Sequence, residues 1–176
     1  HLLSNGTPLA DAAILYHAQS EWSGGSCMYF QKPGRRLMER QMDYDVIPVD
    51  ALEKAVITNN RLVIGAMHYP CLILPFASRI PAAAAQFVKK AGDLGLKVFV
   101  CDALPEMDTM GGKLPCGWAE KAEIVSLDCL AEAVERLTDS LKSRSLSVTG
   151  GIPELRSLTV RHEDGLTAMY FNESVD

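Results

Sequence analysis

The residues best suited to chemistry in this sequence stand in one segment, Tyr16 to Gly25, directly after the apolar run Ala12 to Leu15. An imidazole or a carboxylate can transfer protons, and an indole or phenol ring offers a flat face on which a sugar or a partner surface stacks. The segment supplies all of these groups. The candidate ligand or interface residues are therefore Tyr16, His17, Glu21 and Trp22.

The spacing of these residues does not complete a catalytic site. His17 and Glu21 are four positions apart, which brings side chains together on a helix but fixes nothing in a loop. Sugar hydrolysis needs two carboxylates that face each other, and the other acidic residues near expected strand ends are Asp50, Asp102 and Glu106. Any two could face each other, so no catalytic residue is assigned. The structural alternative is that Trp22 packs over a helix and the backbone satisfies His17.

A cysteine nucleophile is the second functional alternative. Cys101 ends an apolar run, and a nucleophile on a strand-to-helix turn needs small residues two positions before and after it. Phe99 and Ala103 occupy these positions, so only one of the two fits. His162 is the only histidine after Cys101, so the sequence shows no base next to the thiol. Cys101 is therefore interpreted first as a buried structural residue, and second as the nucleophile of a free-standing amidotransferase-like hydrolase.

No cofactor or metal motif is visible in the sequence. Gly24-Gly25 and Gly111-Gly112 lack the spacing of phosphate-binding loops. The five cysteines, at positions 27, 71, 101, 116 and 129, form no C-x-x-C pair and no zinc-like cluster with histidine. We expect no cofactor, no metal and free thiols in the cytoplasm. Secretion stays open, because the chain begins at His1 rather than at methionine.

Composition describes an ordinary globular domain. The chain has 176 residues, of which 48% are hydrophobic and 22% charged, with a net charge of −5. The acidic balance argues against a nucleic-acid partner. No apolar run reaches the roughly 18 residues that a membrane span needs. The partners that remain are neighbouring domains of one polypeptide, a second copy, or a carbohydrate.

Short apolar runs alternate with helical patterns along the chain. Strands are expected at 12–16, 45–49, 61–65, 71–74, 97–101 and 123–127. Helices are expected at 33–42, 50–56, 82 to about 92–95 and 128–141, with Asp50 and Asp128 as N-caps. This alternation predicts an α/β fold: a five-stranded, mainly parallel, flavodoxin-like sheet with helices on both faces. In such a sheet, ligands bind at the carboxyl ends of the strands, where the Tyr16 segment stands.

The pattern changes after Leu141. Residues 143–154 have the serine and glycine content of a linker. Asp164-Gly165 separates two β-prone runs, at 155–160 and 166–171, which is typical of a hairpin. We expect an α/β domain over 1–142, a linker over 143–154 and a hairpin over 155–176. Because a lone hairpin is unstable, it either starts a further β domain or packs on the edge of the main sheet.

Four segments resemble large bacterial glycoside hydrolases of the α-L-rhamnosidase type. Their sequences are LYHAQSEWSG at 15–24, FQKP at 30–33, QMDYDVIPVD at 41–50 and YPCLILP at 69–75. The resemblance extends over about residues 1–140 and is sharpest from 14 to 50. Those enzymes carry this region as an internal domain that resembles class I glutamine amidotransferases, and the trimerisation domain of some bacterial β-galactosidases is similar. The hairpin end, Tyr170 to Ser174, resembles the start of their following β-sandwich.

The resemblance implies a non-catalytic accessory domain of a larger glycoside hydrolase that acts on plant or bacterial polysaccharide. In such proteins the catalytic carboxylates belong to another part of the chain, usually a barrel, so no catalytic residue carries over. Cys101 falls near the amidotransferase nucleophile position, but the small-residue turn and the later H-x-E motif are absent. The surface at Tyr16 to Trp22 would then face a neighbouring domain or a second copy.

Overall fold

The centre of the protein is a five-stranded parallel sheet. The computed structural model describes residues 5–144, 148 and 152–174. The sheet order is β11-β9-β7-β2-β3, and all four neighbouring pairs are parallel. Its strands are β2 (Ala12–Tyr16), β3 (Tyr44–Pro48), β7 (Cys71–Leu74), β9 (Lys97–Cys101) and β11 (Glu123–Val125). Numbered along the chain, this is the flavodoxin-like order 2-1-3-4-5, so the predicted fold class is confirmed.

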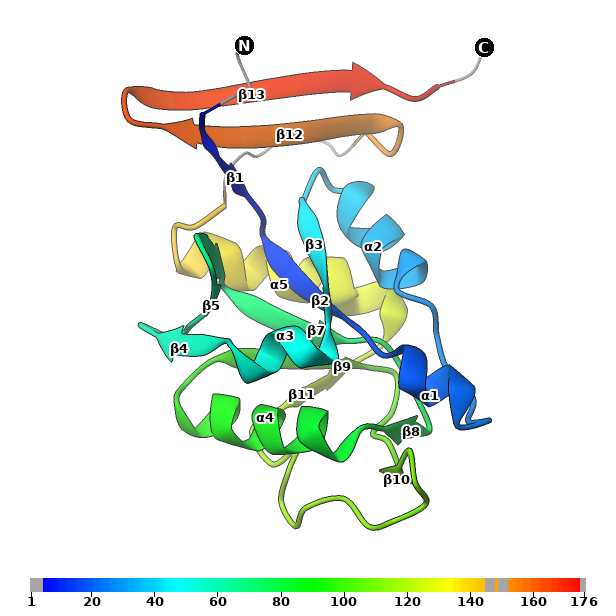
Figure 1. The fold of residues 1–176 in the computed structure, drawn as a ribbon. Coiled ribbons are helices and arrows are strands. Elements are labelled where there is room, and N and C mark those ends of the chain that lie inside the picture. Colours follow the sequence, from blue (N-terminus) through cyan, green and yellow to red (C-terminus); the bar gives the residue numbers. More distant parts are fainter. Residues whose placement is uncertain (1–4, 145–147, 149–151, 175–176) are drawn as a thin grey trace.

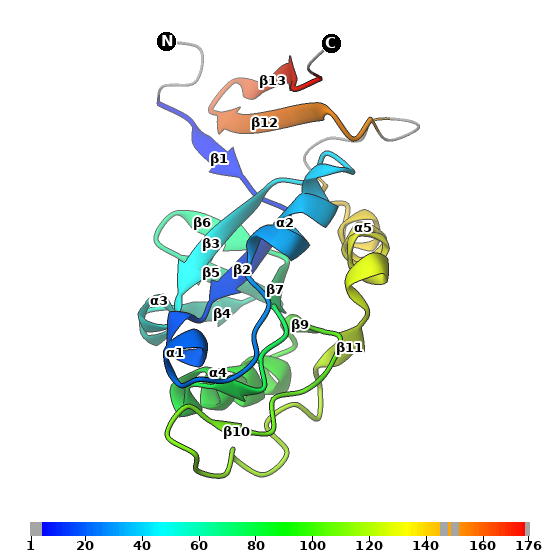
Figure 2. The same cartoon turned by 90° about the vertical axis from the view of Figure 1, so that its right-hand side faces the viewer.

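Helices cover both faces of this sheet (Figures 1 and 2). On one face lie α3 (Val49–Glu53) and α4 (Ala82–Asp93), and on the other α2 (Gln31–Met38) and α5 (Leu130–Ser140). Successive side chains of a strand point to opposite faces. Within β2, Ala13 and Leu15 therefore pack on the α3/α4 side, and Ala12 and Ile14 on the α2/α5 side. One continuous apolar strand thus supplies two core layers.

Of two smaller sheets, one was predicted in part and the other was not predicted. β4 (Val56–Thr58), β5 (Arg61–Ile64) and β6 (Met67–Tyr69) form an antiparallel sheet, of which the sequence indicated β5 alone. Asn59 and Asn60, with φ of 52° and 60°, make the turn between β4 and β5, as a tight hairpin requires. In the loop after β9, the two-residue strand β10 (Met107–Asp108) pairs in parallel with β8 (Arg79–Ile80).

The C-terminal hairpin is present and pairs with the start of the chain. β12 (Leu155–His162) and β13 (Gly165–Asn172) are antiparallel, and β1 (Thr7–Leu9) pairs with the other edge of β12. This three-stranded sheet is separate from the five-stranded one. Since β1 leads directly into β2, the hairpin lies at the amino-terminal end of the parallel strands (Figure 1). It therefore does not extend the edge of the main sheet.

Gln41 fastens the hairpin to the α/β body. Its side chain is 3% exposed, and Nε2 donates hydrogen bonds to the carbonyl oxygens of Ile152 (2.6 Å) and Leu155 (3.2 Å). In return the Ser157 hydroxyl donates to the Gln41 carbonyl oxygen. Gln41 has a φ of 53°, a left-handed conformation that helices cannot continue. The helix expected over 33–42 therefore ends at Met38.

Both predicted N-caps were wrong. α3 begins at Val49 after Pro48, without a side-chain cap, so Asp50 lies inside the helix. Before α5, a short 3₁₀ helix spans Leu127–Cys129, and its cap is Ser126, whose hydroxyl accepts a hydrogen bond from the Cys129 N–H. Asp128 instead forms an ion pair with Arg36 of α2. Its carboxylate therefore links two helical segments rather than starting one.

Candidate functional site

The Tyr16 segment folds into a short helix, α1 (Ala18–Trp22), at the carboxyl end of β2. This end lies beside β7, where the strand order reverses and where open α/β sheets bind ligands. His17 bridges the two strands here, with Nε2 3.5 Å from the Phe76 carbonyl oxygen. The cavity left beside Tyr16, His17 and Tyr29 is about 20 Å³, room for about one water. The segment itself therefore fills the usual ligand position.

His17 is part of the packing at this position. Its side chain is 6% exposed. Burial lowers the pKa of His17, and the hydrogen bond to Phe76 opposes this only in part. Hydrogen bonds to the backbone of Phe76 and Leu15 favour the charged ring, but burial has the larger effect. Of the four residues singled out in the sequence, His17 is the one that the fold encloses.

The other three lie on the surface together with a fourth side chain. Trp22 is 79% exposed, Tyr29 55% and Tyr16 44%. The Tyr29 hydroxyl donates a 3.0 Å hydrogen bond to Glu21 Oε1, which ties the two together. We call Tyr16, Glu21, Trp22 and Tyr29 the strand-end surface. Tyr29 was missed because it stands between Met28 and Phe30 in an apolar trio that is typical of core.

Hydrogen bonds to the segment after β7 hold the strand-end surface in place. Arg79 on β8 donates a 2.9 Å hydrogen bond to the Ser23 carbonyl oxygen at the end of α1. The Ser78 N–H donates to the Ser26 carbonyl oxygen at 2.8 Å, and a β-carbon on Gly25 would lie 2.8 Å from the Ser78 hydroxyl oxygen. This close approach of Ser78 leaves no room for a side chain at position 25, which explains why the residue is glycine. The turn after α1 is therefore held against the segment that follows β7.

Cys101 lies in an environment that disfavours a nucleophile. Its side chain is 0% exposed, and burial, followed by the charge of Asp102, raises the pKa of its thiol to about 12. Asp102 accepts a hydrogen bond from the Leu127 N–H at 2.9 Å and so ties β9 to the next segment. β12, which ends at His162, lies at the opposite end of the parallel strands (Figure 1). No base is brought to Cys101 by that histidine.

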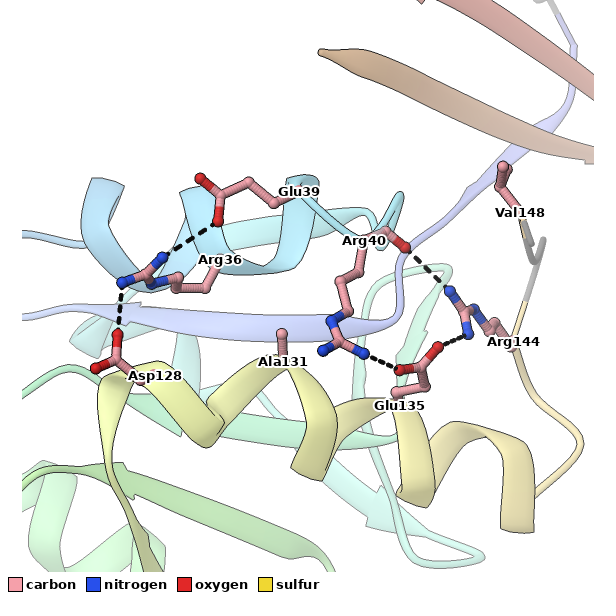
Figure 3. A pocket seen from close by; sticks show the side chains of 8 residues that line it. All are labelled: Arg36, Glu39, Arg40, Asp128, Ala131, Glu135, Arg144 and Val148. Atoms are coloured by element: carbon pink, nitrogen blue, oxygen red, sulfur yellow. Dashed lines mark hydrogen bonds and ion pairs between the residues drawn. The ribbon is translucent and has the colours of Figure 1, made fainter. Parts of the chain in front are cut away.

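A polar groove of about 500 Å³ between α2 and α5 was not foreseen in the sequence. Figure 3 shows Arg36, Arg40 and Arg144 directed at acidic partners. Arg36 pairs with Asp128 at 2.5 Å, Arg40 with Glu135 at 2.8 Å, and Arg144 with the same Glu135. Each guanidinium is thus engaged by a carboxylate of α5 or of the 3₁₀ turn before it. The groove joins two helices and the segment after α5.

The thiols form neither a disulfide nor a metal site in the described part of the chain. All five cysteines are free, and Cys116 and Cys129 are exposed. In the described part of the chain, no three His, Cys, Asp or Glu side chains converge as a metal site requires. Over the same residues, no helix has the length and apolarity needed to cross a membrane.

The strand order and the covering helices define a flavodoxin-like α/β domain. Residues of its own chain, Tyr16 to Trp22, occupy the usual ligand position. No family model and no curated protein matches the sequence. Among solved structures, the fold is similar to that of an apo exo-carrageenase GH42 from Bacteroides ovatus, with a TM-score of 0.61 and 11% sequence identity. The match covers 85% of this chain and 22% of that one, so this chain spans about a fifth of its length. The likeness shows a shared fold.

Proposed function

We propose that this chain is a non-catalytic accessory domain of a larger glycoside hydrolase that acts on plant or bacterial polysaccharide. The observation that carries the proposal is the contrast at the carboxyl ends of the strands. The usual ligand position is reduced to about 20 Å³, while Trp22 beside it is 79% exposed on a fixed base. A contact surface fits this contrast better than an active site. The exo-carrageenase fold and the resemblance to rhamnosidase-type enzymes support the glycoside hydrolase context.

The strand-end surface has the chemistry of an interface centre. Exposed tryptophan and tyrosine side chains are the residues that most often dominate binding between proteins. The hydrogen bond from Tyr29 holds Glu21 in one position, so the carboxylate is ready to accept a partner's donor. We propose that this surface faces a neighbouring domain of the same polypeptide, or a second copy. In this arrangement the catalytic carboxylates belong to the neighbour, and the hairpin begins a following β domain.

Replacing Trp22 in the full-length enzyme tests the interface. Trp22→Ala removes a ring that is 79% exposed, so this domain should unfold at an unchanged denaturant concentration. The activity or the oligomeric state should change if the ring contacts a partner. Met110→Ala is the matched control, because Met110 is 92% exposed and is not part of the strand-end surface. Unchanged activity and unchanged oligomeric state in Trp22→Ala would contradict the proposal.

A sugar titration separates an interface from a binding site. The chain contains two tryptophans, of which Trp118 is 8% exposed and Trp22 is open to solvent. Rhamnose or galactose stacked on Trp22 should change its fluorescence, and the change should disappear in Trp22→Ala. If the fluorescence does not change, the protein does not bind these sugars through this surface. A role as a protein interface is then the remaining function of the strand-end surface.

A further inference from the structure

The hairpin ends in a strand with an open edge. β13 pairs with β12 along all eight of its residues, from Gly165 to Asn172. β12 pairs with β1 on its other side, so β13 is the last strand of its sheet. Within the described residues, no strand pairs with the outer edge of β13. In Figures 1 and 2, β13 lies farther from the parallel sheet than its neighbour β12.

This edge lacks the features that keep exposed strands from pairing. Natural edge strands are usually short, charged, bulged or interrupted by proline. The residues 166–171 read LTAMYF, without a charge, a proline or a glycine. The pairing with β12 runs without a bulge, from Leu155 opposite Asn172 to His162 opposite Gly165. The backbone groups on the outer side are therefore arranged to accept another strand.

Apolar side chains are exposed on both faces of β13. Leu166 (56%) and Tyr170 (46%) share one face, and Met169 (41%) and Phe171 (46%) share the other, since alternate residues point the same way. A strand with large apolar side chains on both faces is typical of the interior of a layered sheet. The edge of β13 is thus uncovered, and both of its faces are covered only in part, one of them by the α/β body around Phe171.

The charges around this edge restrict what can pair with it. Glu163 and Asp164 form the exposed turn before β13, and Glu173, which forms an ion pair with Arg156 of β12, follows the strand. Antiparallel pairing with β13 of a second copy, centred on Ala168, would place Glu163 of one copy opposite Glu173 of the other. Like charges directly opposite each other destabilise a strand pair. An apolar strand with a basic end is the better match.

We propose that the outer edge of β13 pairs with a β-strand from an adjoining domain of the same polypeptide. That strand is apolar opposite residues 166–171 and carries lysine or arginine near the end that faces Glu163 and Asp164. The inference rests on the proposed function, because it needs the longer chain. It is supported by the exo-carrageenase, in which the shared fold makes up 22% of one polypeptide and so adjoins other parts of it.

Amide hydrogen exchange in the full-length protein tests this pairing. In an open edge strand, alternate amides point to solvent and exchange quickly, whereas in an interior strand all are protected. We expect every amide from residue 166 to 171 to be protected at least a hundredfold, at any protein concentration. Fast exchange at alternate residues would overturn the proposal. So would protection that is lost on dilution, because it would assign the edge to a second copy.

Two substitutions examine the contact directly. Ala168→Lys places a charge in the middle of the exposed strand and should reduce protection of the outward amides at least tenfold. Ala83→Lys, at an exposed position of α4, is the matched control and should leave β13 unchanged. Glu163→Lys reverses a charge in the turn without altering the strand, and should weaken protection severalfold by repelling the basic end. Protection that is unchanged in both Ala168→Lys and Glu163→Lys would contradict the proposal.

The two proposals fail separately. A full-length protein that hydrolyses a glycan but exchanges alternate β13 amides freely contradicts the strand pairing and leaves the proposed function standing. A full-length protein with protected β13 amides and no glycoside hydrolase activity contradicts the proposed function and leaves the pairing standing.

Discussion

The Tyr29 hydroxyl donates a 3.0 Å hydrogen bond to Glu21 Oε1 across the turn that contains Gly24 and Gly25. The bond joins the end of α1 to the segment before α2 and fixes a carboxylate beside the exposed Trp22. The hydrogen bond to Glu21, and then the charge of its carboxylate, raise the pKa of Tyr29 above the ordinary value. The interaction can therefore be measured in solution.

Removing the charge of Glu21 should lower the pKa of Tyr29. In Glu21→Gln, the phenol loses a negatively charged neighbour, so tyrosinate should form at lower pH. Alkaline titration followed by tyrosinate absorbance measures the change, and Tyr29→Phe identifies which transition belongs to this residue. A Tyr29 titration that is identical with and without the Glu21 charge would contradict the hydrogen bond.

Gln41→Ala should loosen the hairpin without disturbing the parallel sheet. The change removes the donor to the Ile152 and Leu155 carbonyl oxygens, and the loss should destabilise the protein by about 1–2 kcal/mol. Gln41→Gly loses the same hydrogen bonds but suits the φ of 53°, so it should be about 1 kcal/mol more stable than Gln41→Ala. Denaturant unfolding gives these differences.

Hydrogen exchange shows where the Gln41 effect falls. Amides of β12 and β13 should exchange faster in both variants, whereas those of β7 and β9 should keep their protection. Equal acceleration in the hairpin and in the parallel sheet would mean that Gln41 supports the whole fold rather than the joint.

Asp43 should make the protein less stable as the pH rises. It lines a cavity of about 260 Å³ beneath the hairpin, together with Arg156 and Phe171. Burial raises its pKa from 3.8 to about 6, with a smaller contribution from the charge of Asp45. The folded protein therefore holds the proton more tightly than the unfolded chain. Stability should fall as the pH rises from about 4 to about 6.

Asp43→Asn should remove this dependence. The variant should be about 1–2 kcal/mol more stable than the natural chain at pH 8 and about equal to it at pH 4, a figure that allows for solvent on the open side of Asp43. Urea unfolding at the two pH values measures this, with Asp139→Asn at an exposed position as the control. A natural chain that is more stable than Asp43→Asn at pH 8 would refute the assignment.

Cys101 should be unreactive in the folded protein. Its buried thiol has a pKa raised to about 12, so almost no thiolate is present at neutral pH. A thiol-disulfide reagent should label the exposed Cys116 and Cys129 first, and Cys101 only after unfolding. Mass spectrometry of the labelled peptides distinguishes them. Labelling of Cys101 at the rate of a free cysteine would support the amidotransferase-like alternative.

The five parallel strands could be predicted because each is a short apolar run, and the central ones are buried on both faces. Ala12 to Leu15 and Cys71 to Leu74 need no partner to be recognised. β1, β4 and β6 have three residues each, and most of these residues are exposed or half-buried. Their pairing depends on distant segments, which a local pattern does not record.

The exposure and burial of the candidate residues could be predicted only in part, for a similar reason. Trp22 and Glu21 stand out by type and by their place after a strand. The exposure of Tyr29 follows from the way the chain turns at Gly24 and returns beside Phe76. The burial of His17 follows from the same path. Hydrophobic pattern alone assigns neither.

The pairing of β1 with β12 joins segments that are far apart in the sequence. The conformational entropy lost in closing this loop affects the order in which the elements fold. Thr7 lies opposite Arg161, so this contact closes almost the whole chain into a loop, which forms slowly unless the intervening part is already compact. We therefore expect the parallel sheet and its helices to come together first, and β1 and β12 to pair afterwards. The β1–β12 pair holds the first described strand and the C-terminal hairpin together. A domain whose chain enters and leaves at the same end of its sheet can lie within a longer polypeptide without separating the domains on either side of it.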